Sequence, residues 1–552
     1  MIDDLWYKNA IIYCLDVETY VDANGDGVGD FAGLTQRLAY LAGIGVTCVW
    51  LQPFYPSPNK DNGYDVADYY GVHPKHGTLG EYVEFMNVAH QLGVRVIVDL
   101  VVNHTSDRHP WFRAARKDPK SPYRDWYVWS KARPKGYRDG IVFPGVQTAT
   151  WTRDPVAGAY YFHRFYDCQP DLNTANPAVR REILRVMGFW LELGVSGFRM
   201  DAVPFLISEK GAGLTRPKQD FELLHQMRDF LQWRRRDAIL LAEANVPPKQ
   251  SMDYFGPDGD RIQMLLNFPV NQRLWYALAT ADPRPLVRAL EETRDRPPNA
   301  QWCNFLRSHD EQDLGRLTDA QRRRVFDAFA PSPDMQLYQR GIRRRLAPML
   351  DNDRRRIELA YSLLFTLPGT PMLQYGDEIG MGDDLSLPER ECARTPMQWS
   401  ARPHGGFTAG RRPVRPVIDD QVYGYQTVNV EAQRRDPQSL LNWVERKIRM
   451  RRECPEISWG DWRILPGGDE AAGVLVMRYE YDGRTLVTAH NFTGEPRVVC
   501  LDAADAGGRL LVDLLAAHDS RADGAGRHTV ELPPYGYRWL RAGGIDLTVL
   551  RG

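Results

Sequence analysis

A cation and a carboxylate stand two positions apart in an apolar stretch of the chain, "GVSGFRMDAV" at 194–203. Side chains two apart on a β-strand point to the same face, so Arg199 and Asp201 are aimed into one place. Polar side chains follow other apolar runs in the same way: Asp65 in "GYDV", His104 in "VVNH", Glu243 in "LLAEAN", and His309 with Asp310 in "SHDE". Any one of them alone would be explained as a strand cap, but the whole set predicts a functional site.

Carboxylates, histidines and an arginine on one rim suit the cleavage of a glycosidic bond. In the retaining form of that reaction one carboxylate attacks the anomeric carbon, while a protonated carboxyl group about 5 Å away serves the leaving oxygen. A divalent-metal hydrolase would use similar groups, but its histidine ligands normally occur in HxH or HExxH spacing, which is absent at these positions. The residues therefore favour glycoside chemistry.

Eight short β-rich runs are separated by helix-patterned stretches. The runs span residues 10–18, 46–54, 95–104, 197–203, 239–245, 261–268, 302–310 and 371–380. One helical stretch, "PAVRREILRVMGFWLELG", ends at Gly194, as helices commonly do. This alternation predicts an α/β fold, a (β/α)8 TIM barrel with its catalytic groups at the carboxyl ends of the strands. A doubly wound sheet is the alternative, but no Gly-rich phosphate fingerprint follows the first run.

Two segments depart from the alternation. Residues 104–171 are aromatic and loop-like, which predicts a small inserted domain after the third strand. Residues 457–552 show alternating runs with tight turns, which predict a C-terminal antiparallel β-sandwich. The catalytic barrel then comprises residues 1–103 and 172–456, with a lid-like segment at about 312–357.

Composition narrows the partners and the location. The 552 residues include 70 Lys plus Arg and 71 Asp plus Glu, so the net charge of −1 argues against nucleic acid or an anionic membrane as partner. The amino terminus lacks a signal-peptide pattern, and the seven scattered cysteines without CxxC pairs are typical of reduced thiols, so we expect a cytoplasmic protein. No organic cofactor is called for, and association into a homo-oligomer is left open.

A separate motif, "DANGDGVGD", suits a hard cation. Its oxygen donors alternate along the chain: Asp22, Asn24, Asp26 and Asp30, with the backbone carbonyl of Val28 between them. Calcium takes about six to eight such oxygens, so we expect a structural Ca²⁺ site. The loop begins like an EF-hand but carries Gly33 where the bidentate Glu would stand. A metal-free Asp/Gly turn is the alternative.

Five stretches in order resemble the sequence signatures of the α-amylase superfamily, glycoside hydrolase family 13. They are "VVNH" (101–104), "QPDLN" (169–173), "GFRMDAV" (197–203), "LAEAN" (241–245) and "SHDE" (308–311). "QPDLN" is similar to the extra signature on the α-glucosidase and oligo-1,6-glucosidase side of the family. The resemblance implies Asp201 as nucleophile, Glu243 as general acid and then base, and Asp310 as stabiliser of the transition state.

The same resemblance implies further roles in holding a sugar. His104 and His309 would hydrogen-bond the bound glucose, and Asp65 with Arg394 of "CARTPMQW" would hold the 4-hydroxyl of a terminal glucose in a blind pocket. Arg199 would orient Asp201 and favour its charged form. A drier setting should raise the pKa of Glu243 toward about 6 or higher, so that it starts protonated.

Within the family the strongest likeness is to the trehalose synthases, which interconvert maltose and trehalose, in stretches such as "NGDGVGDFAGLTQRLAYLAGIGV". Small α-linked glucosides are therefore the expected substrates. Isomerisation is favoured, and α-glucosidase hydrolysis with transglucosylation stays open because the same intermediate serves both. A non-catalytic binding module is disfavoured by the three intact carboxylates. A second calcium site at Asn103 and Asp171 is left open, since Ser208 stands where a Glu ligand is expected.

Overall fold

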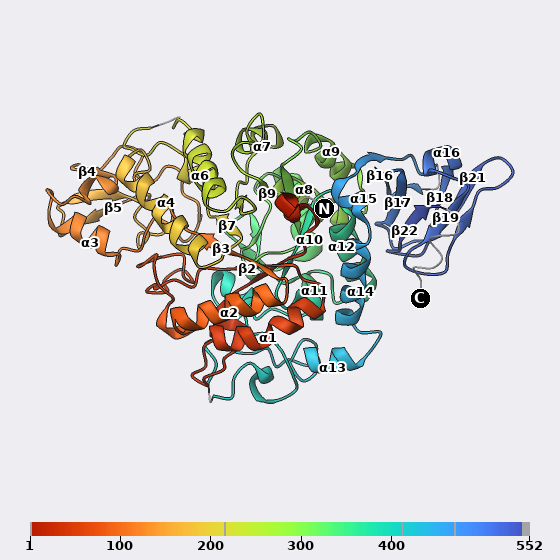
Figure 1. The fold of residues 1–552 in the computed structure, drawn as a ribbon, viewed down its shortest axis with the longest axis horizontal. Coiled ribbons are helices and arrows are strands. Elements are labelled where there is room, and N and C mark those ends of the chain that lie inside the picture. Colours follow the sequence, from red (N-terminus) through yellow and green to blue (C-terminus); the bar gives the residue numbers. More distant parts are fainter. Residues whose placement is uncertain (1–2, 215–216, 411, 469–470, 544–552) are drawn as a thin grey trace.

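The computed structural model describes residues 3–214, 217–410, 412–468 and 471–543, and its centre is a closed barrel of eight parallel strands (Figure 1). The strands follow the order β1-β14-β10-β9-β8-β7-β3-β2 around the barrel. Their bounds are β1 Ile12–Leu15, β2 Cys48–Leu51, β3 Arg95–Leu100, β7 Gly197–Met200, β8 Ile239–Ala242, β9 Met264–Leu266, β10 Gln301–Phe305 and β14 Thr370–Gln374. Each overlaps one of the eight predicted runs, so the predicted (β/α)8 barrel is confirmed.

Helices surround the barrel (Figure 1). The longer ones are α1 Phe31–Gly43, α2 Leu79–Gln91, α4 Pro177–Glu192, α6 Phe221–Arg234, α7 Pro248–Phe255, α8 Phe268–Thr280, α9 Arg284–Glu292, α10 Asp319–Phe329, α12 Arg354–Thr366 and α14 Leu440–Arg452. Shorter ones are α5 Val203–Leu206, α11 Leu346–Met349, α13 Val430–Arg435 and α15 Pro455–Trp459. Local sequence sets their ends: α4 starts at the Asn176 cap with proline in its first turn, and Gly194, with φ of 98°, follows its last residues.

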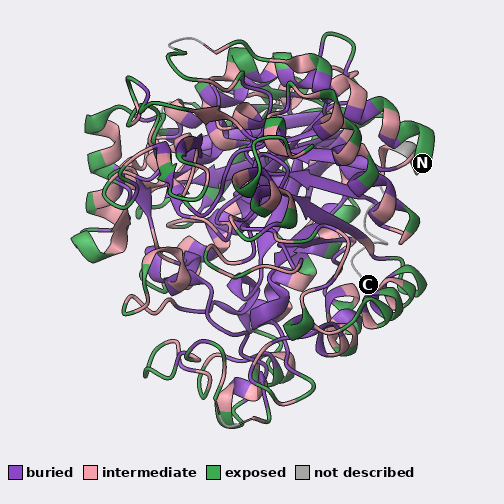
Figure 2. Ribbon diagram, turned by 90° about the vertical axis from the view of Figure 1, so that its left-hand side faces the viewer, coloured by how far each residue is buried: buried purple, intermediate pink, exposed green. Residues whose placement is uncertain are grey.

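Apolar side chains fill the inside of the barrel, while the charged groups stand at its carboxyl end. A buried cluster that includes Ile12, Trp50, Ile97, Leu241 and Met264 occupies the interior. Figure 2 shows the barrel strands as continuously buried and the outer loops as exposed. Burying each such side chain contributes about 1.5–3 kcal/mol, so the strand ends are held on a rigid support.

An inserted domain follows β3. It contains α3 Pro110–Lys117 and the three-stranded sheet β4-β6-β5, with β4 Trp129–Ser130, β5 Trp151–Asp154 and β6 Ala159–Phe162. A second small sheet follows β10, in the segment predicted to be lid-like, and consists of β11 Gln312–Asp313, β12 Gln336–Leu337 and β13 Gly341–Ile342. Val142 and Phe143 of the inserted domain, together with Arg340 of the second sheet's β12–β13 turn, line the same pocket.

The C-terminal domain is antiparallel, as predicted, and in Figure 1 it lies at the end of the molecule away from the inserted domain. Its six-stranded sheet, β15-β16-β17-β22-β19-β20, comprises β15 Asp461–Ile464, β16 Val474–Tyr481, β17 Arg484–Asn491, β19 Leu510–Asp513, β20 Ser520–Arg521 and β22 Tyr537–Ala542. A second sheet pairs β18 Arg497–Asp502 with β21 Arg527–Leu532, and α16 spans Ala503–Ala506. Residues 544–552 of the predicted domain lie outside the described residues. Among the described residues, no helix has the length and apolar character that a membrane crossing needs.

Candidate active site

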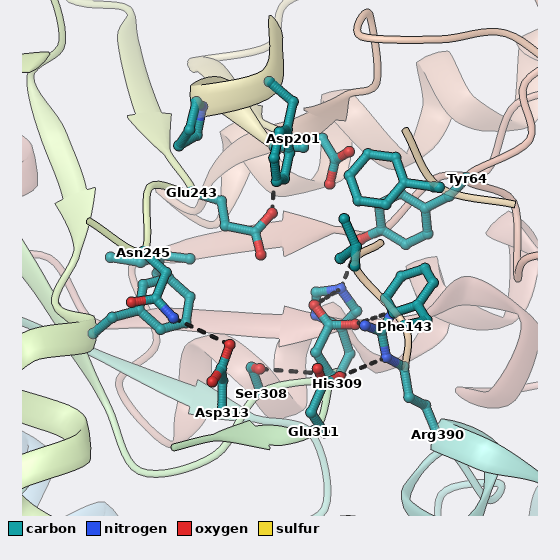
Figure 3. Close-up of a pocket in the computed structure, with 18 of the residues that line it drawn as sticks. Tyr64, Phe143, Asp201, Glu243, Asn245, Ser308, His309, Glu311, Asp313 and Arg390 are labelled. Carbon is teal, nitrogen blue, oxygen red and sulfur yellow. Dashed lines mark hydrogen bonds and ion pairs between the residues drawn. The ribbon is translucent and has the colours of Figure 1, made fainter. Parts of the chain in front are cut away.

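Arg199 is the centre of the charged group at the barrel mouth. It lies in β7, is 1% exposed, and its Nη1 donates to Asp99 Oδ1 at 2.7 Å and to Asp201 Oδ1 at 2.6 Å. Its Nη2 donates to Glu243 Oε2 at 2.8 Å, and Figure 3 shows Asp201 and Glu243 facing the same pocket. A buried charge must be paired, and this guanidinium pairs with three carboxylates at once. This pairing explains why an apolar strand ends in opposite charges.

Strand register brings the two expected catalytic carboxylates together. Met200 of β7 pairs with Ala242 of β8, so Asp201 and Glu243 leave neighbouring strands at the same level. Ala202 then adopts the left-handed region with φ of 49°, and its N–H donates to Glu243 Oε2 at 3.2 Å. A non-glycine residue there is strained, and such strain is typical of functional sites.

Burial governs the ionisation of these two carboxyl groups. It raises the pKa of both Asp201 and Glu243 to about 7, and Arg199 opposes the rise in each case. For Glu243 the direction matches the expectation. Arg199 was also expected to keep the pKa of Asp201 low, but burial and the nearby carboxylates of Asp99 and Asp310 outweigh the guanidinium. Near neutral pH the pair therefore shares about one proton, which is what a nucleophile and an acid require.

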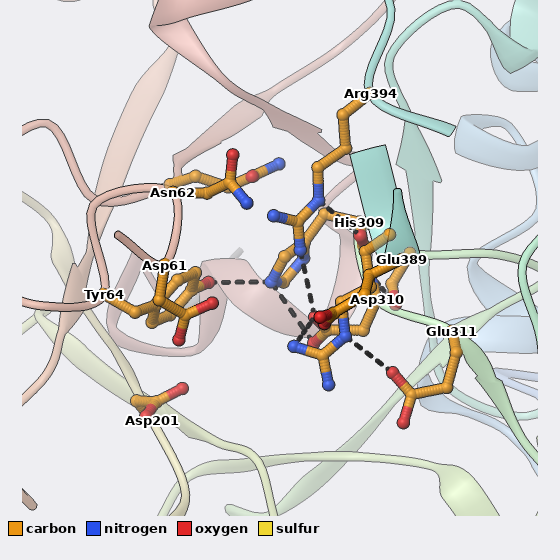
Figure 4. A network of polar contacts seen from close by, with 12 residues as sticks. Asp61, Asn62, Tyr64, Asp201, His309, Asp310, Glu311, Glu389 and Arg394 are labelled. Atoms are coloured by element: carbon orange, nitrogen blue, oxygen red, sulfur yellow. Dashed lines mark hydrogen bonds and ion pairs between the residues drawn. The ribbon is translucent and has the colours of Figure 1, made fainter. Parts of the chain in front are cut away.

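Asp310 lies across the pocket in a more positive setting (Figure 4). Its Oδ1 accepts from Arg394 Nη2 at 3.2 Å, as Figure 4 shows, and lies 3.0 Å from Arg390 Nη1. Burial acts to raise the pKa of Asp310, but these two arginines, together with Arg199, bring it below its ordinary value. Asp310 is thus ionised at neutral pH and can stabilise positive charge on a sugar.

The two expected sugar-binding histidines line the same pocket. Burial lowers the pKa of His104 to about 4 and that of His309 well below its ordinary value, so both rings are neutral. His309 Nε2 is 2.7 Å from the Tyr64 hydroxyl, which donates to Asp99 Oδ2 at 3.1 Å. Neutral imidazoles offer both a donor and an acceptor, as hydroxyl recognition needs.

One expected site residue is placed differently. Asp65 does not pair with Arg394 among the described contacts; its carboxylate accepts from Ser57 Oγ at 2.9 Å and from the backbone N–H groups of Lys60 and Asp61. Asp65 therefore shapes the loop, and Asp61, four residues earlier, lines the pocket instead. Burial raises the pKa of Asp61 to about 6.

Sequence reasoning also missed residues that the structure brings to the site: Asp99, Tyr64, Gln169, Arg390 and Phe143. Gln169 is the first residue of "QPDLN", and its Nε2 donates to Asp61 Oδ2 at 2.8 Å. Asp61 and Arg390 each precede an expected residue by four positions, in stretches whose loop conformation no periodicity specifies. For Asp61 and Arg390 the sequence motif nearby identified the correct loop, but not the residue in that loop that lines the pocket.

The predicted calcium loop is a compact turn. Asp22 Oδ1 and Oδ2 accept from the N–H groups of Gly25 and Gly27, each at 2.7 Å, while Asp30 Oδ1 accepts from Gly33 N at 2.6 Å. In the described part of the chain no three His, Cys, Asp or Glu side chains converge as metal ligands. Every side-chain donor atom of the loop is an oxygen, the type that calcium prefers, and each carboxylate oxygen can accept more than one contact.

An ammonium group fills the position considered for a second calcium site. Lys210 Nζ lies 3.0 Å from Asp171 Oδ2 and donates to Asn103 Oδ1 at 2.8 Å and to the Leu172 carbonyl at 2.9 Å. These are the oxygens that a calcium ion would use at this position. The ammonium group of Lys210 supplies the positive charge there instead of a calcium ion.

Comparisons with known proteins agree with this geometry. The family described as "Alpha amylase, catalytic domain" matches residues 16–330 and 342–460, and "Sucrose hydrolase-like, C-terminal domain" matches residues 483–541. The trehalose synthase of Pimelobacter sp. (strain R48) is 41% identical, over 98% of this chain and 97% of that protein. The trehalose synthase/amylase of Mycobacterium tuberculosis (strain H37Rv) is 40% identical, over 98% of this chain and 90% of that protein.

Solved structures with a similar fold include sugar-converting enzymes. The trehalulose synthase of Pseudomonas mesoacidophila MX-45 matches with a TM-score of 0.77 and 26% identity, over 97% of this chain and 99% of that one. A mutant of the trehalulose synthase has been solved with the substrate sucrose. The chain belongs to the alpha-amylase family, glycoside hydrolase family 13. It is an enzyme of the glycosidase and transglucosidase type, similar over its length to trehalose synthases.

Proposed function

We propose that this enzyme interconverts maltose and trehalose by moving a glucosyl unit within one bound sugar pair. The observation that carries the proposal is the single Arg199 guanidinium that contacts both Asp201 and Glu243. One guanidinium holds the two carboxylates close together, as the retaining mechanism requires with its spacing of about 5 Å. Similarity to trehalose synthases over 98% of the chain supports the choice of maltose and trehalose among small α-glucosides.

The first step forms a glucosyl-enzyme. A carboxylate oxygen of Asp201 bonds to the anomeric carbon of the non-reducing glucose, and the bond from that carbon to the linking oxygen breaks. Glu243 gives its proton to the leaving oxygen, which releases glucose with a free 4-hydroxyl. Asp310 stabilises the positive charge on the ring, since its own charge is maintained by arginine.

The second step reverses the chemistry with a new acceptor atom. The released glucose turns so that the oxygen of its α-anomeric hydroxyl bonds to the anomeric carbon, the ester bond to Asp201 breaks, and Glu243 takes up the hydroxyl proton. We expect the second glucose to be held by polar groups that line the pocket, among them Asn245, whose Nδ2 donates to Asp313 Oδ2 at 3.1 Å. The product is α,α-trehalose.

Water must be kept from the glucosyl-enzyme for this reaction, and the pocket has a cover. Arg340 joins the two sides of that cover: its Nη1 donates to the Val142 carbonyl of the inserted domain at 2.7 Å, and its Nε lies 3.3 Å from Asp313 Oδ2. A water-excluding closure is what separates transfer to sugar from hydrolysis.

Maltose as sole substrate tests the proposal. We expect α,α-trehalose to accumulate ahead of free glucose when all products are identified over time. If glucose dominates from the first minutes and trehalose is undetectable, the enzyme is an α-glucosidase that uses the same three carboxylates, and the isomerase proposal is wrong.

We also propose that the loop 22–30 binds Ca²⁺ through Asp22, Asn24, Asp26, Asp30 and the Val28 carbonyl. Support comes from its all-oxygen donor set and its buried Asp22 and Asp30 carboxylates. An ion that binds only the native state adds about 2.7 kcal/mol at a hundred times its dissociation constant, so a chelator should lower the melting temperature. Asp26→Ala should abolish that response. An unchanged melting curve in chelator would favour the metal-free turn.

We also propose a cytoplasmic location. All seven cysteines are free thiols and six of them are buried, as is typical of proteins in a reducing compartment.

A further inference from the structure

Three aromatic rings from two distant segments meet beside the pocket and are called the roof below: Phe143, Tyr166 and Tyr338. The Phe143 ring stacks on Tyr166 at 4.9 Å between centroids and lies 4.7 Å from Tyr338. Phe143 and Tyr166 belong to the inserted domain, whereas Tyr338 follows β12. The roof therefore exists only while these segments are in contact.

Glu389 fastens the roof to a third segment. Its Oε2 accepts from the hydroxyls of both Tyr166 and Tyr338 at 2.6 Å. Glu389 and Tyr338 also share an unusual backbone, with φ of 41° and 53°. The left-handed region is strained for such residues and persists only where surrounding contacts impose it. Two strained residues thus hold each other in place.

Arg390, the next residue, connects the roof to the reacting groups. Its guanidinium lies over the Phe143 ring at 5.0 Å and the Tyr338 ring at 5.4 Å. The same guanidinium contacts Asp310 Oδ1 through Nη1 at 3.0 Å and Glu311 Oε2 through Nε at 2.7 Å. One side chain therefore contacts both the roof and the expected stabiliser of the transition state, and Figure 3 shows Arg390 beside Phe143.

We propose that Arg390 is a positioning residue that makes the placement of Asp310 depend on closure of the roof. The inference rests on the proposed function and adds to it a dependence of catalysis on closure of the roof. With the roof assembled, Phe143 and Tyr338 fix the guanidinium plane, and Asp310 is held toward the sugar. When the roof parts, Arg390 loses both rings and Asp310 loses its position, so the glucosyl-enzyme forms and breaks down more slowly while bulk water has access.

The electrostatics of Asp310 agree with this assignment. Among the arginines that lower its pKa, Arg390 has the largest effect, ahead of Arg394 and Arg199. Arg394 is anchored differently, because its Nε donates to the backbone carbonyl of His309 at 2.8 Å. Of these arginines, only Arg390 contacts the roof in the described structure.

A double-mutant cycle tests the coupling with an aryl α-glucoside, whose cleavage does not depend on trehalose formation. Tyr338→Phe keeps the ring but removes the hydroxyl bound to Glu389, and we expect kcat to fall by about tenfold with KM little changed. In an Arg390→Lys background the same change should have less than about a twofold effect, because the connection is already lost. Tyr361→Phe is the matched control, since the hydroxyl of Tyr361 has no hydrogen-bond partner among the described residues.

The outcomes are distinguishable. Equal effects of Tyr338→Phe in both backgrounds, or no effect in either, would overturn the role of Arg390. Melting temperatures of all variants separate coupling from simple destabilisation, and Tyr166→Phe provides a second hydroxyl deletion if one variant fails to fold. Failure to form trehalose from maltose, with the cycle intact, would count against the proposed function alone.

Discussion

The two sides of the pocket are built in different ways. The side that holds the reacting carboxylates is made from the ends of neighbouring strands, so register places Asp201 next to Glu243. The roof is made from loops of the inserted domain and the turn after β12, and Glu389 joins them through its contacts with Tyr166 and Tyr338. Chemistry thus rests on the rigid barrel, and access rests on parts that can separate.

This contrast assigns different properties to the two sides. Loss of the nucleophile Asp201 should affect every reaction of the enzyme equally, because all of them pass through the same intermediate. Loss of a roof contact should slow formation of the intermediate through Arg390, and it should also change the fate of the intermediate that still forms, because water gains access. Substitutions on each side therefore test the comparison.

The largest expected effect belongs to the nucleophile. Asp201→Asn removes the attacking charge at nearly constant volume, so turnover of maltose and of an aryl α-glucoside should both fall by several orders of magnitude. Asp319→Asn, an exposed change on α10, is the control. Proton NMR of the parent should show α-glucose as the first anomer released. An initial β-anomer would rule out the covalent mechanism.

The pH profile should report the shared proton on the strand-end side. Asp201 and Glu243 have pKa values raised to about 7, and activity needs the first ionised and the second protonated. Values of kcat/KM should therefore fall on both sides of neutral pH. Glu243→Gln should lose the alkaline limb with an activated aryl α-glucoside, whose leaving group needs no proton. Retention of that limb would assign the acid to another residue.

A smaller effect is expected on the roof side. Phe143→Ala removes the ring that packs against Tyr166 and Tyr338, and water should then compete for the glucosyl-enzyme. The ratio of glucose to trehalose formed from maltose should rise by about tenfold, a barrier difference of about 1.4 kcal/mol. Val146→Ala, at a 44% exposed residue of the same segment, is the control. An unchanged ratio in Phe143→Ala would show that the roof does not exclude water.

The same contrast explains what the sequence could predict. The eight strands and Asp201, Glu243 and Asp310 were predictable because strand register and chain order specify strand ends. Asp61 and Arg390 were missed, because a loop has no period from which to infer which of its residues face the pocket, whereas the predicted Arg394 contacts Asp310. The raised pKa of Asp201 could not be inferred either, since it depends on Asp99 and Asp310, which come from other parts of the chain.

The central claim is that the released glucose reorients inside a closed pocket without leaving it, and isotope exchange tests this claim most directly. The enzyme is incubated with unlabelled maltose and an excess of labelled free glucose, and the trehalose formed is isolated early in the reaction. If the glucose never leaves, the trehalose should carry almost no label. Label in the trehalose in proportion to the external glucose would show that the pocket opens between the two steps, and would contradict the account.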